Sequence, residues 1–319
     1  MWKTILRRVI LMIPQIIILS LFIFLLAKMM PGEPFTGLIT PNTSPSQIAN
    51  LRQEAGLNNP WSVQYVSWVG RAFHGDFGMS YAMQRPVTEI IGERAVNTLY
   101  LAILSVIITY VIAIPFGVWA GRYEGTWIDT SIQFYNFISM STPSFVVYLL
   151  AIAAFGFGLK WFPTSGSVSV NASGFFGIIA SRIYHIILPS ILIGILTNAS
   201  TVQYLRSGIV DNKLEDYVKT ARSKGVPERV VFNRHILRNS LLPIAAFFGN
   251  VITGLLGGAI FAETIFSYPG MGKLFIDSVN GRDYSVMTAL VLLYGILTLL
   301  GNLLSDIIMS IVDPRIRID

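Results

Sequence analysis

The sequence predicts an all-α, polytopic membrane protein with six transmembrane helices and a long first extracytoplasmic loop. Of its 319 residues, 53% are apolar and only 13% are charged, whereas about 25% are charged in an ordinary soluble domain. Six apolar stretches are each long enough to cross about 30 Å of hydrocarbon as a helix. They are Val9 to Met30, Thr98 to Ala120, Ile132 to Leu159, Ile183 to Leu205, Leu241 to Phe266 and Val286 to Val312. An even number of crossings puts both termini on one side.

The first span is expected to stay in the mature protein. Its apolar core outlasts the h-region of a signal peptide, and Lys28-Met29-Met30-Pro31 offers no small-residue cleavage site. Lys and Arg are more abundant in the loops on the side of the amino terminus, which predicts that both termini are cytoplasmic. The expected organisation is a cytoplasmic N-terminus with the first helix (1–30), an extracytoplasmic cap (31–97), and a core of five transmembrane helices (98–319) with a cytoplasmic loop at 207–240.

The loop at 31–97 carries helix signals of its own and is predicted to be a small folded cap. Ser44 or Ser46 is expected to begin a helix that stops at Gly56, and Asn59-Pro60 a second helix. That second helix would carry Trp61, Tyr65, Trp68, Val69 and Ala72 on one face. A turn is expected at 75–78, and Thr88 as a cap before the second span. The alternative is a docking surface for an external protein.

Within the spans, prolines and glycines predict local geometry. Kinks are expected at Pro14, Pro115, Pro143 and Pro189. The pairs Gly117 with Gly121 and Gly254 with Gly258 have the spacing that allows close helix approach. The third span carries a polar run that is unfavourable in lipid and is expected to face protein or a wet cavity: Gln133, Asn136, Ser139, Ser141 and Thr142.

Several classes of chemistry are excluded. The chain has no cysteine, and its three histidines fall on separate segments, so no metal site is expected. The spans contain few ionisable groups that could converge on a catalytic site, so the chain is not expected to be an enzyme. The stretch Ser267 to Leu274 lacks the first Gly and the Ser or Thr of a phosphate loop, so no nucleotide site is expected and any ATP would be hydrolysed by another chain. The net charge of +6 is explained by the excess of Lys and Arg in the loops on the side of the amino terminus. The sequence therefore does not indicate binding to nucleic acid.

Two intramembrane carboxylates, Glu263 and Asp306, keep ion coupling open as a hypothesis. Glu263 precedes Pro269-Gly270 and is instead expected to link the end of its helix to the outer loop. Asp306 lies within a turn or two of the inner surface.

A charged island between Asp211 and Asn239 stands out among the apolar runs. It contains an i, i+3, i+4, i+7 pattern that predicts a short amphipathic helix whose apolar stripe needs a partner surface: Leu214, Tyr217, Val218 and Ala221. Asp211 or Asn212 is expected to cap this helix, and Gly225 to stop it in a left-handed conformation. Pro227 would begin a second helix.

The island reads Glu215-Asp216-Tyr217-Val218-Lys219-Thr220-Ala221-Arg222-Ser223-Lys224-Gly225, then His235-Ile236-Leu237-Arg238-Asn239-Ser240-Leu241-Leu242-Pro243. It resembles the cytoplasmic signature loop of binding-protein-dependent ABC importer permeases. The general pattern of that loop is Glu-Ala-Ala, three residues, Gly, nine residues and then Ile-x-Leu-Pro. In this chain Lys219-Thr220-Ala221 occupies the Glu-Ala-Ala position, and Gly225 occupies the position of the Gly. Arg238 falls where the general pattern has proline, and the Leu-Pro comes later, as in the oligopeptide and dipeptide branch.

Other segments agree with that branch: Gly75-Asp76-Phe77-Gly78-Met79-Ser80, Arg85-Pro86-Val87, Asn97-Thr98-Leu99, Glu263-Thr264-Ile265-Phe266, Pro269-Gly270-Met271-Gly272 and Asp313-Pro314-Arg315-Ile316-Arg317. Their order resembles the B-type permease subunit of a peptide importer. The resemblance implies an ABC type I importer permease fold, a second permease subunit, two cytoplasmic ATPases that hydrolyse the ATP, an extracytoplasmic peptide-binding protein and a peptide substrate.

By position in the resembling loop, the expected ATPase-coupling residues are Tyr217, Ala221, Arg222 and Gly225. The expected lining of the translocation path is Asn136, Ser139 and Thr142. Two other classes stay open, an ion-coupled secondary transporter or channel subunit and a membrane scaffold. For the amphipathic helix itself, the alternative is a position on the lipid surface.

Overall fold

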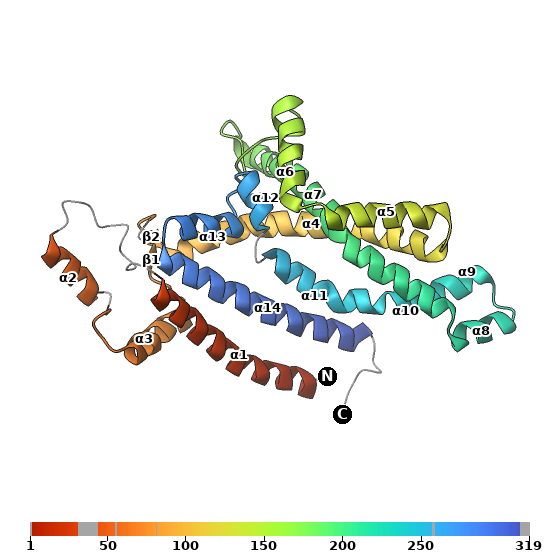
Figure 1. Cartoon of the computed structure of the whole chain (residues 1–319), viewed down its shortest axis with the longest axis horizontal. Coiled ribbons are helices and arrows are strands. Elements are labelled where there is room, and N and C mark those ends of the chain that lie inside the picture. Colours follow the sequence, from red (N-terminus) through yellow and green to blue (C-terminus); the bar gives the residue numbers. More distant parts are fainter. Residues whose placement is uncertain (1, 31–43, 55, 81, 257–258, 313–319) are drawn as a thin grey trace.

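The computed structural model describes residues 2–30, 44–54, 56–80, 82–256 and 259–312, and these are almost entirely helical (Figure 1). Before the core come α1 (Trp2–Met29), α2 (Pro45–Glu54), α3 (Trp61–Phe73) and the antiparallel pair β1 (Met79–Ser80) and β2 (Arg85–Pro86). The core comprises α4 (Val87–Arg122), α5 (Trp127–Ser141), α6 (Ser144–Ala151), a π-helix (Ile152–Gly158), α7 (Gly174–Lys213), α8 (Asp216–Ser223), α9 (Glu228–Val230), a second π-helix (Val231–Leu237), α10 (Arg238–Ser240), α11 (Leu242–Leu256), α12 (Ile260–Ile265), α13 (Met271–Asn280) and α14 (Tyr284–Val312).

Four of these helices, α1, α4, α7 and α14, are long and apolar enough to cross a membrane. The stretch Phe247–Ile265, which includes α12 and most of α11, is a fifth candidate span, and a bent pair of helices is a sixth if it counts as one span. The bent pair is the third predicted span, and the kink expected at Pro143 is confirmed as a full break between two helices. A 94° angle separates α5 from α6 and the π-helix that continues it. The break follows Thr142, whose backbone is extended, because Pro143 disfavours a helical conformation in the residue before it. Pro14, Pro115 and Pro189 lie inside α1, α4 and α7.

The core is built on the contact between α4 and α7. A Cβ on Gly117 would lie 2.7 Å from Leu205 Cβ, and one on Gly121 would lie 2.7 Å from Ile209 Cβ. The predicted close helix approach is confirmed for this glycine pair. Gly254 has open space around its Cβ position, and its predicted companion, position 258, lies outside the described residues.

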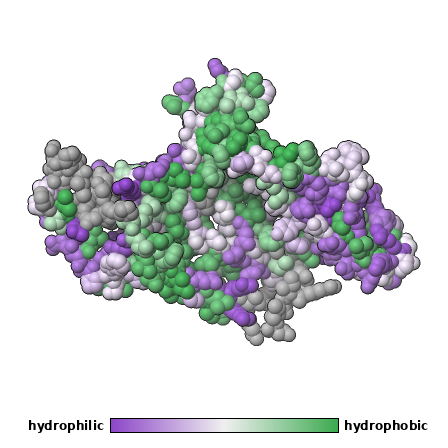
Figure 2. Space-filling model, in the orientation of Figure 1, coloured by the Kyte–Doolittle hydropathy of each residue, from purple (hydrophilic) through white to green (hydrophobic). Residues whose placement is uncertain are grey.

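The two ends of the bundle differ in character. Figure 1 shows α2, α3 and the strands at one end and α8 with α9 at the other; α1 begins and α14 ends toward the α8 end. Figure 2 shows hydrophilic residues gathered over α8 and α9, whereas α6 projects from the bundle with a largely hydrophobic surface.

The predicted cap elements are largely confirmed. Ser44 Oγ accepts a hydrogen bond from the Gln47 backbone N–H at 3.3 Å, which makes Ser44 the cap of α2. α3 packs on α1, where the Tyr65 hydroxyl is 2.9 Å from Ser20 Oγ. Thr88 is not a cap, because α4 already begins at Val87; its hydroxyl donates to the Gly75 carbonyl at 2.6 Å.

One buried ion pair joins α5 to α7, and it was not predicted from the sequence. Arg206 donates from Nε to Asp129 Oδ1 at 2.6 Å and from Nη2 to Oδ2 at 2.8 Å. The Gly125 backbone N–H donates to the same carboxylate at 3.0 Å. Two opposite charges on neighbouring spans are the signal that could have revealed it.

Replacing Asp129 by alanine is expected to lower the free energy of unfolding by about 2 kcal/mol, because Arg206 would lose its partner while remaining three-quarters buried. A double-mutant cycle with Arg206→Ala, followed by thermal unfolding in detergent, measures the coupling energy. The exposed pair Asp216 and Lys219 is the matched control and should couple by less than about 0.5 kcal/mol. Equal coupling in both cycles would contradict a structural role for Asp129.

Candidate functional site

The charged segment, residues 214–240, begins where α7 ends. The predicted cap is wrong, since Asp211 and Asn212 lie inside α7 and the residue before α8 is Glu215. α7 continues this far because its last turns are held by other parts of the chain. Lys213 Nζ donates to the Arg122 carbonyl at 3.2 Å, and Asn212 Nδ2 to Ser240 Oγ at 3.2 Å. The predicted stripe is shorter than expected, as Leu214 lies before α8 and is exposed.

The apolar face of α8 packs on its own chain. Val218 is 0% and Ala221 7% exposed, and they form one cluster with Ile209 of α7 and with Val231 and Ile236 of the second π-helix. The predicted need for a partner surface is therefore met internally. This also leaves no apolar stripe of Val218 and Ala221 for a lipid surface. Ala221, one of the four predicted coupling residues, therefore lies on the buried side of the charged segment and not on its outer face.

The outer face of the segment carries the other three predicted coupling residues. Tyr217 is 37% exposed and hydrogen-bonds through its hydroxyl to Asn212. Arg222 donates to both oxygens of Glu228, at 3.0 and 2.7 Å. Gly225 has φ +74°, and nothing lies within 4 Å of its Cβ position. The predicted left-handed stop is confirmed.

Two ion pairs fix the charges on this face. The hydrogen bond from Arg222 holds the pKa of the Glu228 carboxyl below its ordinary value. Lys219 likewise lowers the pKa of Asp216. Both carboxyls are therefore ionised at neutral pH, and the face keeps a basic excess through other exposed side chains: Lys224, Arg229, Arg234 and Arg238. A rigid, charged surface with one exposed aromatic ring suits a protein partner.

The residues predicted to line a path lie in or beside the contact between α5 and α7. Asn136 is 3% exposed, and Ser139 donates to the Ile195 carbonyl at 3.2 Å. Thr142 is only partly exposed and donates to the Ile138 carbonyl at 2.8 Å. Asn136 and Ser139 therefore face protein, one of the two environments expected for this polar run. A role in a path stays a prediction.

The intramembrane carboxylates both have partners. Glu263 is 0% exposed and accepts hydrogen bonds from Thr98 Oγ1 at 2.8 Å and from the backbone N–H groups of Gly272 and Lys273 at 2.7 and 3.0 Å. The predicted link between its helix end and the outer loop is confirmed. Asp306 pairs with Arg8 at 3.0 Å. Among the described residues, no three His, Cys, Asp or Glu side chains lie close enough to hold a metal ion.

The structure is a polytopic helical membrane bundle with a folded, charged segment at one end. The chain belongs to the family of binding-protein-dependent transport system inner membrane components. The model of that family matches residues 113–318, and the model of the corresponding N-terminal region matches residues 1–102. The chain is thus a transport permease subunit.

Relatives cover the chain almost completely. It is 39% identical over 314 residues to the oligopeptide transport system permease protein AppB of Bacillus subtilis, covering 98% of each chain. It is 34% identical over 317 residues to the glutathione transport system permease protein GsiC of Salmonella choleraesuis, covering 99% of each.

A solved inward-facing structure of the MetNI methionine ABC transporter has the same fold. Its TM-score is 0.55 at 16% identity, covering 74% of this chain and all of that one. The expected ABC type I importer permease fold is confirmed.

Proposed function

We propose that this chain is a transmembrane subunit of an ATP-driven peptide importer. It pairs with a second permease, and two cytoplasmic ATPases supply the energy. The permeases named for oligopeptides and glutathione support a peptide cargo. An extracytoplasmic binding protein delivers the cargo, as the family's description implies.

One observation carries the proposal: the docking face of the charged segment is exposed while the segment's apolar side is buried against α7. Tyr217, Arg222 and Gly225 are free to meet an ATPase, and Val218 and Ala221 transmit force to the bundle. Because internal packing backs the segment, a push on α8 moves α7 as well. The excess of Lys and Arg supports a cytoplasmic position for this end and for both termini.

No specific observation favours an ion-coupled transporter. Asp129, Glu263 and Asp306 already have partners, which leaves none of them free to bind a coupling ion without breaking a contact. The exposed faces of α2 and α3, at the opposite end, are the proposed side for the binding protein.

Reconstitution tests the proposal. The permease pair and the ATPases, in proteoliposomes with the binding protein outside, should accumulate labelled peptide only when ATP is present on the α8 side. A photo-crosslinking residue at Tyr217 should join this chain to an ATPase. The same residue at Phe73, exposed at the end of α3, is the control and should not. Uptake that follows an ion gradient without ATP would overturn the proposal.

A further inference from the structure

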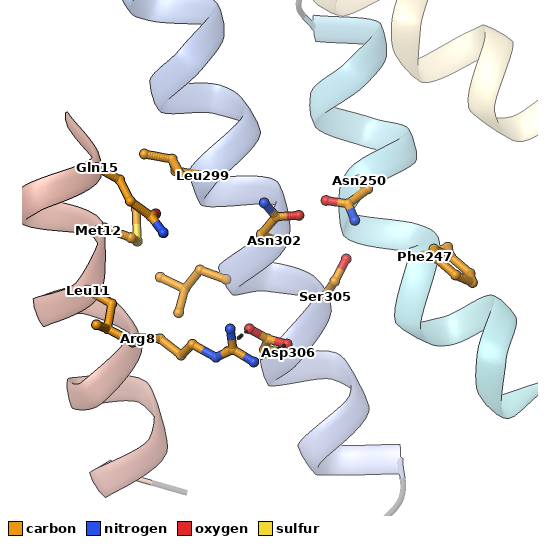
Figure 3. A pocket seen from close by; sticks show the side chains of 11 residues that line it. Arg8, Leu11, Met12, Gln15, Phe247, Asn250, Leu299, Asn302, Ser305 and Asp306 are labelled. Atoms are coloured by element: carbon orange, nitrogen blue, oxygen red, sulfur yellow. Dashed lines mark hydrogen bonds and ion pairs between the residues drawn. The ribbon is translucent and has the colours of Figure 1, made fainter. Parts of the chain in front are cut away.

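A cavity of about 330 Å³ opens between α1, α14 and α11 (Figure 3). α1 contributes residues from Arg8 to Gln15, α11 contributes Phe247 and Asn250, and α14 contributes residues from Leu299 to Asp306. These stretches come from the first half of α1, the middle of α11 and the second half of α14. The cavity therefore lies in the half of the bundle that carries α8.

The cavity contains polar groups that the fold does not use. The side-chain amides of Gln15, Asn250 and Asn302 make no hydrogen bond to any described residue. The Ser305 side chain is buried, and its hydroxyl lacks a partner among the described residues. Figure 3 shows Asn250 and Asn302 extending toward each other from α11 and α14, with Gln15 reaching in from α1. Unpaired amides are unfavourable in hydrocarbon, so the cavity must face water or a polar ligand.

Closer packing cannot remove this cavity. α11 and α14 already approach as closely as their backbones allow: a Cβ on Gly249 would lie 2.7 Å from the Gly301 carbonyl oxygen. A Cβ on Gly301 would lie 1.9 Å from Thr253 Oγ1. The side chains of Asn250 and Asn302 therefore lie beside a helix pair that cannot pack more closely.

The lining fits the main chain of a peptide. Each primary amide offers both a donor and an acceptor, as a peptide bond does. Arg8 and Asp306 neutralise each other at the inner rim, so no net charge selects among cargo side chains. A phospholipid phosphate would need an uncompensated cation, and Arg8 already has a carboxylate partner.

We propose that this cavity is the inner part of the translocation path and that Gln15, Asn250 and Asn302 bind the main chain of the passing peptide. The inference rests on the proposed importer function. It deepens that function, since it replaces the buried Asn136 and Ser139 with three accessible amides as the path lining. Binding through main-chain groups allows cargo of varied sequence to pass.

Cysteine accessibility tests the proposal cleanly, because the native chain contains no cysteine. Asn302→Cys, Asn250→Cys and Gln15→Cys would be placed in the full complex in proteoliposomes. A membrane-impermeant methanethiosulfonate reagent would be added on the α8 side. We expect modification in all three, slowed about tenfold by tetra-alanine at about ten times its dissociation constant. Ile18→Cys on α1, exposed and outside the cavity, is the control and should react slowly with or without peptide.

Transport supplies a second readout. Asn302→Leu, similar in size but without hydrogen bonding, should reduce tetra-alanine uptake about tenfold with an unchanged thermal unfolding midpoint, whereas Asn302→Gln should restore part of it.

Three results would overturn the inference while wild-type uptake persists: reaction without peptide protection, reaction only with lipid-soluble maleimides, or crosslinking of position 302 to the second permease without labelling. Failure of the wild-type complex to import any peptide would instead remove the proposed function, and the inference with it.

Discussion

A Gly225→Tyr permease is expected to insert and fold normally but to lose ATP-driven peptide uptake. No atom lies within 4 Å of a Cβ placed on residue 225, so a larger side chain can begin there without an immediate clash. The tyrosine side chain projects from the docking face beside Arg222, where the ATPase is proposed to bind. Loss of a central interface contact is worth about 2 kcal/mol or more, which corresponds to at least a roughly 30-fold loss of affinity.

Backbone strain must be separated from bulk, because φ is +74° at this position. Gly225→Ala carries the left-handed strain of about 1–2 kcal/mol with little added volume. Gly225→Asn is the milder control, since asparagine tolerates this conformation. Co-purification of the ATPases and peptide uptake should follow the order Gly, Asn, Ala, Tyr. Normal ATPase recovery and uptake with Gly225→Tyr would place the docking surface elsewhere on the chain.

Glu263→Ala is expected to destabilise the part of the core where α12 meets α13 by on the order of 2–6 kcal/mol. The carboxylate is 0% exposed and accepts three hydrogen bonds, two of them wholly buried. Each buried donor left without an acceptor costs about 1–3 kcal/mol. The carboxylate also fills the space beside Gly270, where a Cβ would lie 2.3 Å from Glu263 Cδ, so its removal opens a void.

Thermal unfolding in detergent, followed by tryptophan fluorescence, measures this loss. Glu263→Gln keeps the shape but turns one acceptor into a donor, so an intermediate loss is expected. Glu89→Ala, on the exposed first turn of α4, is the matched control and should change stability by less than about 1 kcal/mol. A stable Glu263→Gln permease that loses uptake specifically would contradict a purely structural role and revive ion coupling.

Much of this fold follows from hydropathy and from local signals. The apolar runs in α1, α4, α7 and α14 are long enough that the membrane leaves only a helical conformation. The stop at Gly225 is equally local, because few other residues adopt its backbone conformation freely. Such features depend on short stretches of sequence and on whether lipid or water surrounds them. Both can be inferred from the sequence.

What the sequence could not supply was tertiary geometry. Pro143 predicted a kink in the third span, but neither the proline nor the hydropathy indicated that the bend would reach 94°. The end of α7 depends on contacts with Arg122 and Ser240, which are far away in the chain. The burial of Val218 and Ala221 likewise depends on residues beyond Gly225 that fold back over α8. The amides of the cavity come from three separate spans, and only their shared depth in the membrane could have linked them.

The length of α7 has a mechanical consequence. Its 40 residues form one helix of about 60 Å, roughly twice the hydrocarbon thickness. A tilt of about 10° around the midpoint displaces each end by about 5 Å in opposite directions. Because α4 packs closely on α7 at Gly117 and Gly121, the two helices would tilt together. A displacement of the α7 end that lies beside α8 would therefore move the opposite end of the helix in the other direction.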